Sequence, residues 1–365
     1  MTLRLAATFV LILPAIATAQ QITTPHASFL DIPARQAELK STTNLLLRSA
    51  IKSLPSCADT KLILPPAGRM EIPHHYLSGS NGPTNPAEKA ATELYNSFEK
   101  RITAGMNQYI ATGSQSEAAC SLAQLDAWAK ANALIDYDPK DSSQAWFQAE
   151  WTLSAAGVTD SVLVNDPALD SAQQIRVATW LDHAARTLIS FDKPGSDAGK
   201  NNHHYWRALA ATSIGVTAND NTLFQFGIDA FKGAVDEINS AGALPKEMAR
   251  HENAIHYQGF ALTPLVLIAE FAARQRVDLY AYTANGHTLR DAIIFYGRAI
   301  DDPSLVKPFT SDEQGPTTNL NDFAAFNFFV ARFGPTGIPP AILKGLQHSI
   351  VTTRIGGNTT VLAAK

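Results

Sequence analysis

Segments with apolar residues at helical spacing follow one another along most of this 365-residue chain. The first begins at Asn85, which can cap a helix, and at Pro86, which suits the first helical turn. Similar stripes follow at residues 118–134, 175–188, 204–216, 223–238, 261–272, 289–299 and 320–333. Alternation with a period of two is scarce, so no substantial sheet is expected. The pattern predicts an all-α protein whose paired helices form an (α/α) barrel or toroid over residues 87–365.

The residues before this helical region follow a different pattern. A positively charged start, an apolar run and Ala17-Thr18-Ala19 are typical of a signal peptide, so we expect residues 1–19 to be removed and the mature chain to begin at Gln20. No later apolar run is long enough to span a membrane. Residues 20–86 carry prolines and short polar clusters, which predict an irregular N-terminal arm. The sequence therefore indicates an exported, soluble protein.

Export bears on the two cysteines of the chain, Cys57 and Cys120. An oxidising compartment favours a disulfide between them, which would tether the arm to the helical region. The alternative is two separate buried thiols. We expect the disulfide.

Two clusters of polar and aromatic residues interrupt the helical pattern. The first, Lys200 to Trp206, supplies amide, imidazole, phenol and indole groups, although Asn, His and Tyr are only middling helix formers. In a purely structural role, Tyr205 and Trp206 would anchor the core and the two asparagines would cap a helix. Because a second cluster follows at residues 250–257, we interpret both as parts of a binding cleft.

The spacing of residues in the second cluster favours some kinds of chemistry and argues against others. Arg250 and Tyr257 are seven residues apart, so on a continuous helix they would project from one face about 10 Å apart, with room for one sugar ring between them. His251 and His256 are five apart, whereas a zinc-binding helix needs histidines four apart, so no metal site is expected. No G-x-S-x-G turn supports serine chemistry. Hydrolysis by two carboxylates stays open, because the acid and the base could come from Glu247, Glu252 and Asp166.

Three separated motifs share their order and spacing with a known family. They are Ala119-Cys120-x-Leu122 with Ala127-Trp128-Ala129-x-Ala131-x-Ala133-Leu134, then Asn201-Asn202-His203-x-Tyr205-Trp206, and then Leu244-Pro245-x-Glu247 leading through Arg250 to Tyr257 and Ala261-Leu262. Together they resemble polysaccharide lyase family 5, the periplasmic alginate lyases. The resemblance covers residues 55–275, and the sequence beyond residue 300 diverges.

The resemblance implies an (α/α) toroid that cleaves β-1,4-linked polyuronates by β-elimination, without metal or cofactor. Asn202, His203 and Arg250 match the positions that neutralise the sugar carboxylate next to the C5 proton, an arrangement equivalent to an oxyanion hole. Tyr257 matches the tyrosine that removes this proton and protonates the leaving oxygen on C4. For a sugar with the opposite configuration at C5, His203 is the alternative base.

Further residues are expected to bind the substrate, and some depart from the family pattern. They are Lys200, Asn201, His204, Tyr205, Trp206, His75, Tyr76 and Trp128. His204 replaces a small serine, and His75 lies in a lid segment of the arm where relatives often place a lysine before the tyrosine. An imidazole in place of that permanent charge would make affinity for a polyanion depend on pH.

These observations predict a metal-independent lyase of the periplasm, or a secreted one, that acts as a monomer on poly-β-D-mannuronate (alginate). A formal net charge of −4 means that a local basic groove has to meet the anionic polysaccharide, and nothing indicates nucleic-acid binding. The nearest alternative is a lyase of glucuronan or another glucuronate polymer. Two further alternatives are a glycoside hydrolase on an α/α barrel and a non-catalytic polysaccharide-binding protein.

Overall fold

Helices make up almost all the regular structure in the computed structural model, which describes residues 20–78, 82–192, 200–315 and 319–365. The predicted signal peptide, residues 1–19, lies outside the described residues. The α-helices are α1 (Ile32–Ser41), α2 (Leu45–Lys52), α3 (Pro86–Thr112), α4 (Gln115–Lys130), α5 (Ser143–Leu163), α6 (Ser171–Ser190), α7 (Asn202–Ala218), α8 (Asn221–Asp236), α9 (Pro245–Met248), α10 (Ala254–Arg274), α11 (Leu289–Asp301), α12 (Phe326–Phe333), α13 (Pro340–Gly345) and α14 (Thr359–Ala363).

Short 3-10 turns and one small hairpin complete the regular structure. The turns are η2 (His251–Asn253), η3 (Pro303–Val306), η4 (Leu320–Phe323) and η5 (Thr353–Ile355). The strands β1 (Val351–Thr352) and β2 (Gly357–Asn358) pair antiparallel on either side of η5. Among the described helices, none is long and apolar enough to cross a membrane.

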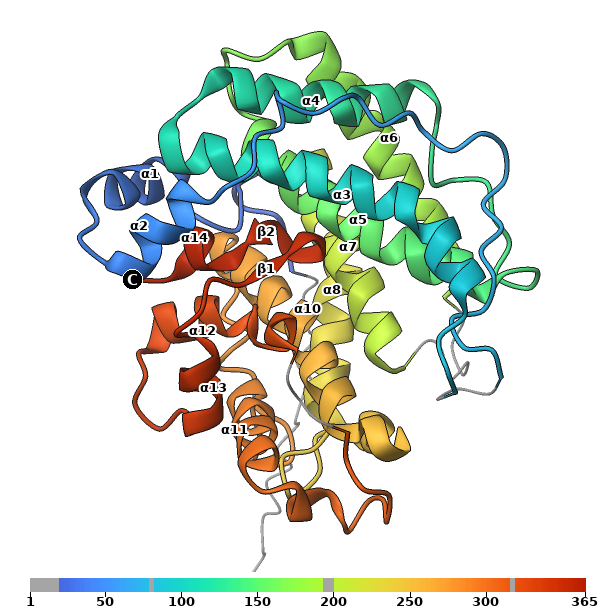
Figure 1. The fold of residues 1–365 in the computed structure, drawn as a ribbon, viewed down its shortest axis with the longest axis vertical. Helices are drawn as coiled ribbons and strands as arrows, with labels where there is room; N and C mark the ends of the chain where they lie inside the picture. The colour runs from blue at the N-terminus through green and yellow to red at the C-terminus, as the bar shows by residue number, and fades with distance from the viewer. Residues whose placement is uncertain (1–19, 79–81, 193–199, 316–318) are drawn as a thin grey trace, which may run out of the picture.

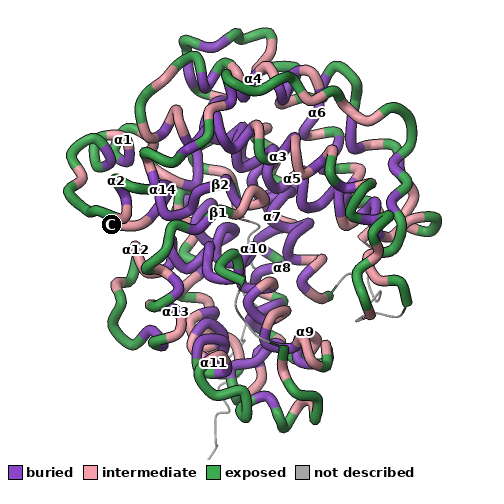
Figure 2. Tube along the Cα trace, in the orientation of Figure 1, coloured by how far each residue is buried: buried purple, intermediate pink, exposed green. Residues whose placement is uncertain are grey.

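The long helices alternate between an inner and an outer position. The inner helices α3, α5, α7 and α10 are successive neighbours, and the outer helices α4, α6, α8 and α11 each pack against one of them (Figure 1). Buried residues run along α5, α7 and α10 in the middle of the molecule, whereas exposed residues follow the outer helices and loops (Figure 2). This confirms the predicted all-α (α/α) toroid.

The central helix α5 is missing from the predicted stripes, because it has no polar face. Nineteen of its 21 residues are buried. A helix that is covered on all sides shows no amphipathic periodicity, so no apolar stripe in the sequence indicates it. At Gly157, an added Cβ would lie 2.4 Å from the Ser213 hydroxyl of α7, so the glycine permits the close approach of α5 and α7. This approach brings functional groups of the two helices together.

Two predicted stripes extend beyond the helices that form. The stripe 118–134 ends as helix α4 at Lys130, because Asn132 and Leu134 adopt positive φ angles of 48° and 64° and turn the chain. The stripe 320–333 is divided into η4 and α12. Apolar residues in these turns still face the core, which explains why their spacing resembled that of one helix.

The N-terminal arm is less irregular than the sequence indicates, because it contains α1 and α2. Asp31 and Asn44 cap these helices by accepting hydrogen bonds from backbone N–H groups of their first turns. Both helices are short, with 10 and 8 residues, so neither offers a long enough stripe for a prediction. From residue 53 to the start of α3, the described residues of the arm form no α-helix, as expected.

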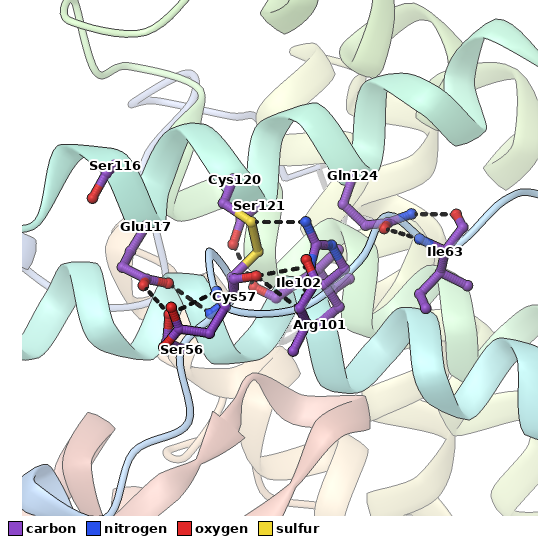
Figure 3. The surroundings of a disulfide bond; sticks show 12 residues. Ser56, Cys57, Ile63, Arg101, Ile102, Ser116, Glu117, Cys120, Ser121 and Gln124 are labelled. Carbon is purple, nitrogen blue, oxygen red and sulfur yellow. Dashed lines mark hydrogen bonds between the residues drawn. A yellow bond between two sulfur atoms is a disulfide. The ribbon is translucent and has the colours of Figure 1, made fainter.

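The predicted disulfide between Cys57 and Cys120 is confirmed, and it joins the arm to α4 (Figure 3). The carboxylate of Glu117, one turn earlier on α4, accepts hydrogen bonds from the Ser56 hydroxyl (2.5 Å) and the Cys57 backbone N–H (2.7 Å). One turn after Cys120, the Gln124 amide makes two further bonds to the arm backbone. The bridge is therefore one of several contacts that hold the arm on α4.

Replacing both cysteines with serine is expected to lower the free energy of unfolding by about 4 kcal/mol, because the bridge closes a loop with a sequence separation of 63. Urea unfolding of the double variant measures this change, and reduced wild-type protein is the control. Equal stability of oxidised and reduced protein would contradict the expectation.

Candidate active site

A cavity of about 710 Å³ lies where the inner helices α3, α5, α7 and α10 meet the arm and the hairpin β1–β2. Its wall combines apolar side chains with groups of both charges. The acidic groups are Glu88, Glu99 and Asp322, and the basic groups and imidazoles are His74, His75, Lys100, His203, Arg250, His256 and Arg354. Arginine, lysine and protonated imidazole side chains in one concave site attract anions even when the whole protein has a negative net charge.

His203 lies in the first turn of α7, where the Asn201 side chain caps the helix by accepting a hydrogen bond from its backbone N–H. Its Nδ1 lies 2.6 Å from a carboxylate oxygen of Glu150 on α5, and its ring stacks on Phe147 with 3.6 Å between ring centroids. Burial lowers the pKa of His203 well below its usual value, and the charges of Arg207 and other arginines lower it further. These effects favour the neutral form of the His203 imidazole at the cavity wall.

Asn202 is fully buried beside His203 and does not line the cavity. Its backbone N–H and its side-chain amide donate to the two carboxylate oxygens of Glu247, at 2.6 and 2.9 Å. Burial raises the pKa of Glu247 to about 7, and the hydrogen bonds from Asn202 oppose this shift. Glu247 therefore orients the amide of Asn202.

Arg250 and Tyr257 are in direct contact, which corrects the prediction of a sugar ring between them. The guanidinium carbon lies 4.0 Å from the centroid of the tyrosine ring. Helix α10 begins only at Ala254, and His251 in the preceding turn has a φ of 54°, so Arg250 is not on the same continuous helix. The two side chains therefore form one cationic and phenolic unit.

The hydroxyl of Tyr257 lies 3.1 Å from the hydroxyl of Tyr76, which the arm brings to the cavity. Burial and the neighbouring Tyr257 raise the pKa of Tyr76 above that of a free phenol. Tyr76 therefore keeps its proton and can donate a hydrogen bond to the Tyr257 oxygen. Beside it, His75 Nδ1 lies 3.3 Å from Glu88 of α3.

The structure adds Arg354, which the sequence did not indicate as functional, to the cavity, and it gives His256 of the second cluster a carboxylate partner. Arg354 on η5 stacks over Trp151, with its guanidinium carbon 3.9 Å from the ring centroid. His256 donates or accepts through Nδ1 at 2.9 Å from Asp322, which follows it by 66 positions. Burial opposes protonation of His256, but the hydrogen bond and charge of Asp322 outweigh it and raise its pKa. Arg354 adds a permanent positive charge to the cavity, and the Asp322 carboxylate favours the protonated form of His256.

The expected substrate-binding residues divide into two groups. Those that line the cavity are Asn201, Trp206, His75 and Tyr76. Trp206 is nearly buried, and its indole N–H has no partner among the described residues. Lys200 is exposed but does not line the cavity, and His204 binds Asp192 through Nδ1 at 2.8 Å. Tyr205 is buried in the core.

Trp128 lies in the core and not in the cavity, which corrects the expectation that it binds the substrate. It is fully buried, stacks on Phe98 and donates its indole N–H to the backbone oxygen of Ile63 at 2.9 Å. An inward-facing aromatic residue on α4 satisfies the same sequence motif as a sugar-stacking one. The residue therefore anchors the arm on the toroid.

The structure does not bring the carboxylates considered for hydrolysis together in the cavity. It also gives the two histidines considered for zinc separate partners. Glu247, Glu252 and Asp166 do not line the cavity. His251 binds Asp312, whereas His256 binds Asp322. Across the residues that the structure describes, no cluster of three or more potential ligands could hold a metal ion.

Replacing Arg354 with alanine is expected to raise KM for an anionic polymer roughly tenfold, because a charge-assisted hydrogen bond contributes about 1.5–3 kcal/mol. The effect on kcat is expected to be smaller, since Arg354 stacks on Trp151 and not on Tyr257. Steady-state kinetics at two salt concentrations measure both parameters. The control is the Arg290→Ala variant, whose arginine does not line the cavity, and an unchanged KM for Arg354→Ala would contradict the expectation.

Comparison with known proteins agrees with the fold. The family model described as alginate lyase matches residues 18–306. A polysaccharide lyase of Stenotrophomonas maltophilia is 29% identical over 343 residues, which cover 92% of this chain and 97% of that protein. An alginate lyase of Pseudomonas syringae pv. syringae is 27% identical over 289 residues, 77% of this chain and 74% of that protein.

Solved structures extend the similarity to the whole toroid. Alginate lyase A1-III from Sphingomonas species A1 has a TM-score of 0.87 at 39% identity, covering 94% of this chain and 97% of that chain. A histidine-to-alanine variant of alginate lyase A1-III, complexed with a tetrasaccharide, has a TM-score of 0.89 at 38% identity, covering 95% and 98%. The chain is therefore a polysaccharide lyase that belongs to the alginate lyase family.

Proposed function

We propose that this protein cleaves alginate by β-elimination and prefers stretches of β-1,4-linked D-mannuronate. The observation that carries the proposal is the unit of Arg250, Tyr257 and Tyr76 in a cavity that also contains Lys100, Arg354 and several imidazoles. Its relatives include proteins named alginate lyase, and histidine-to-alanine and tyrosine-to-phenylalanine variants of A1-III are complexed with a tetrasaccharide. Phenol, guanidinium and imidazole are the groups that this elimination needs.

The first requirement is to neutralise the sugar carboxylate. Loss of the C5 proton places negative charge next to this carboxylate, so the intermediate is unfavourable until cations or hydrogen bonds stabilise it. In the proposed mechanism Arg250 provides the nearest permanent charge, whereas the Asn202 amide is buried behind the cavity wall and donates to Glu247. Arg354 and the His256 imidazolium hold neighbouring carboxylates of the polymer.

The second requirement is proton transfer. The Tyr257 oxygen, as a phenolate, takes the proton from C5; the electron pair of that bond forms the C4–C5 double bond, and the C4–O bond breaks. The departing oxygen then takes the proton from Tyr257. In mannuronate the C5 proton and the C4 oxygen lie on the same face of the ring, so one group serves both steps. The Tyr76 hydroxyl donates to the Tyr257 oxygen, and the Arg250 charge lies over its ring.

His203 serves the C5 epimer in this proposal. In guluronate the C5 proton lies on the opposite face, out of reach of a base that protonates the C4 oxygen. A neutral imidazole at the cavity wall is a suitable proton acceptor there. The enzyme acts as an exported monomer in this proposal, in the periplasm or outside the cell; the predicted signal peptide and the disulfide support export.

Ultraviolet absorbance of the mature protein mixed separately with polymannuronate, polyguluronate, glucuronan and hyaluronan tests the proposal. We expect the signal of C4–C5 unsaturated uronate to grow fastest with polymannuronate, and EDTA to leave the rate unchanged. A faster rate on glucuronan would assign the alternative substrate. New reducing ends without unsaturation would indicate hydrolysis and overturn the proposal, as would binding without cleavage.

A further inference from the structure

Glu150 connects the cavity histidine to a buried ionic chain. One of its carboxylate oxygens lies 2.6 Å from His203 Nδ1, and the other accepts a hydrogen bond from Arg207 Nη1 at 3.0 Å. Glu150 and Arg207 have no exposed surface, and His203 has a side-chain exposure of 12%. Both oxygens of Glu150 are therefore engaged, each by a group on α7.

The ionic chain continues away from the cavity. Arg207 Nε donates to Asp192 at 2.9 Å, and the same Asp192 oxygen lies 2.8 Å from His204 Nδ1. Arg207 also stacks over Trp146, with 4.0 Å between its guanidinium carbon and the ring centroid. Carboxylates on two sides hold this cation in place, and a buried arginine with two such partners has little freedom to move.

The two neighbours of Glu150 restrict its protonation. Burial raises the pKa of Glu150, and the charge and hydrogen bond of Arg207 oppose this. Arg207 can only donate, so the oxygen that faces it keeps a lone pair toward the guanidinium and is the less favourable site for a proton. The other oxygen faces His203, so a single proton lies between Glu150 and Nδ1. The permanent charge of Arg207 favours the carboxylate, which leaves the proton on the imidazole nitrogen.

We propose that Glu150 is a positioning residue that holds the neutral His203 ring with its proton on Nδ1, so that the lone pair of Nε2 is available at the cavity. The catalytic consequence of this tautomer rests on the proposed function, whereas the tautomer itself does not. A ring in this form cannot donate from Nε2 to a sugar carboxylate, but it can accept a proton. Glu150 therefore makes His203 a base and leaves carboxylate neutralisation to Arg250 and the other cations.

The groups around His203 are consistent with this arrangement. Phe147 and Trp151 of α5 pack on the ring and offer no acceptor. The charged groups nearby are Arg207, Arg250 and Arg354, which disfavour a second proton on the ring. Glu150 is thus the carboxylate that the structure places on the ring nitrogen, and it decides which nitrogen of the neutral ring is protonated.

The tautomer of His203 is measurable directly by nitrogen NMR of protein labelled at histidine, with the His203→Asn variant to assign the signal. In the wild type at neutral pH we expect a protonated Nδ1 and an unprotonated Nε2. The opposite tautomer in the wild type, with the proton of the pair on Glu150, would overturn the proposal. This measurement needs no substrate, so it stands even if the proposed function fails.

The Glu150→Gln variant tests whether Glu150 determines the tautomer of His203. Its amide oxygen has to face Arg207, which only donates, so its NH₂ group faces His203 and forces Nδ1 to become an acceptor. We expect the proton to move to Nε2 and the rate on polyguluronate, relative to polymannuronate, to fall at least tenfold. An unchanged tautomer in a folded Glu150→Gln protein would contradict the role of Glu150.

A matched control separates positioning from stability. Glu270 is another buried glutamate with an arginine partner, Arg332, and it does not line the cavity. We expect Glu270→Gln to lower the melting temperature but to leave the His203 tautomer and the ratio of the two rates unchanged. A changed tautomer in this variant would show that any buried charge loss produces the effect, and would overturn the assignment to Glu150.

Discussion

The Tyr257→Phe variant is expected to lose turnover by at least roughly 10³-fold while KM for the polymer changes little. General acid and general base catalysis each contribute about 10²–10⁴-fold, and in the proposed mechanism the phenolic oxygen performs both. The substitution removes only that oxygen, so the ring can still stack against Arg250. Initial rates of ultraviolet absorbance on polymannuronate, together with calorimetric binding of an oligosaccharide, measure the two quantities.

Variants of two neighbouring residues serve as controls for Tyr257. Tyr76→Phe removes the hydrogen bond to the Tyr257 oxygen but not the transferring group, so about a tenfold loss of kcat is expected. Glu252→Gln is expected to retain most activity, because Glu252 does not line the cavity. Wild-type turnover of Tyr257→Phe, or complete loss with Glu252→Gln, would refute the assignment of proton transfer to Tyr257.

The Asp160→Asn variant is expected to stabilise the protein at neutral and alkaline pH. Asp160 has no exposed surface, and neither of its carboxylate oxygens has a hydrogen-bond partner among the described residues. Burial raises the pKa of Asp160 to about 7, and the nearby Thr217 hydroxyl opposes this only in part. A buried charge without a full set of partners destabilises the folded state, and asparagine removes it.

The ionisation of Asp160 determines how the free energy of unfolding changes with pH. In the unfolded chain Asp160 ionises near pH 4, whereas in the folded protein it keeps its proton until about pH 7. Between these values the folded state binds more protons, so the free energy of unfolding falls as pH rises and then stays low. At pH 8 we expect Asp160→Asn to gain up to about 4 kcal/mol over wild type, and at pH 4 almost nothing.

Urea unfolding at pH 4, 5, 6, 7 and 8 measures this difference. The control is Asp126, also nearly buried, whose carboxylate pairs with Arg176 and Lys130. Burial opposes ionisation of Asp126, but its two partners outweigh it and lower its pKa. Asp126→Asn is therefore expected to destabilise at neutral pH, with an effect that shrinks as the pH falls. Equal pH slopes for wild type and Asp160→Asn would contradict the account of Asp160.

Much of the fold was predictable because it depends on local patterns. Helices with one polar and one apolar face, such as α6 and α8, have their stripe in the sequence itself. The disulfide was predictable from two cysteines and the pattern of a signal peptide. Helix α5 was not predictable in this way, because its neighbours cover it on every side and its composition alone does not show that.

The candidate site was predictable only where its residues are close together in the chain. Residues 200–206 and 250–257 indicated a cleft, because polar and aromatic groups replaced good helix formers there. The same reasoning placed Trp128 in the cleft, since burial and sugar stacking need the same side chain. It also placed Arg250 on the helix of Tyr257, although a turn intervenes.

The sequence by itself determined the helical class of the protein, its disulfide and two segments that contribute residues to the cavity wall, because short-range periodicity and residue chemistry carry that information. Only the tertiary structure decided which groups meet. The pairs His203 with Glu150, Tyr257 with Tyr76 and Arg354 with Trp151 are separated by 53, 181 and 203 positions, and no local pattern links such partners. Packing of α5 against α7, and of the arm and hairpin over the toroid, brings them together because each buries apolar surface there.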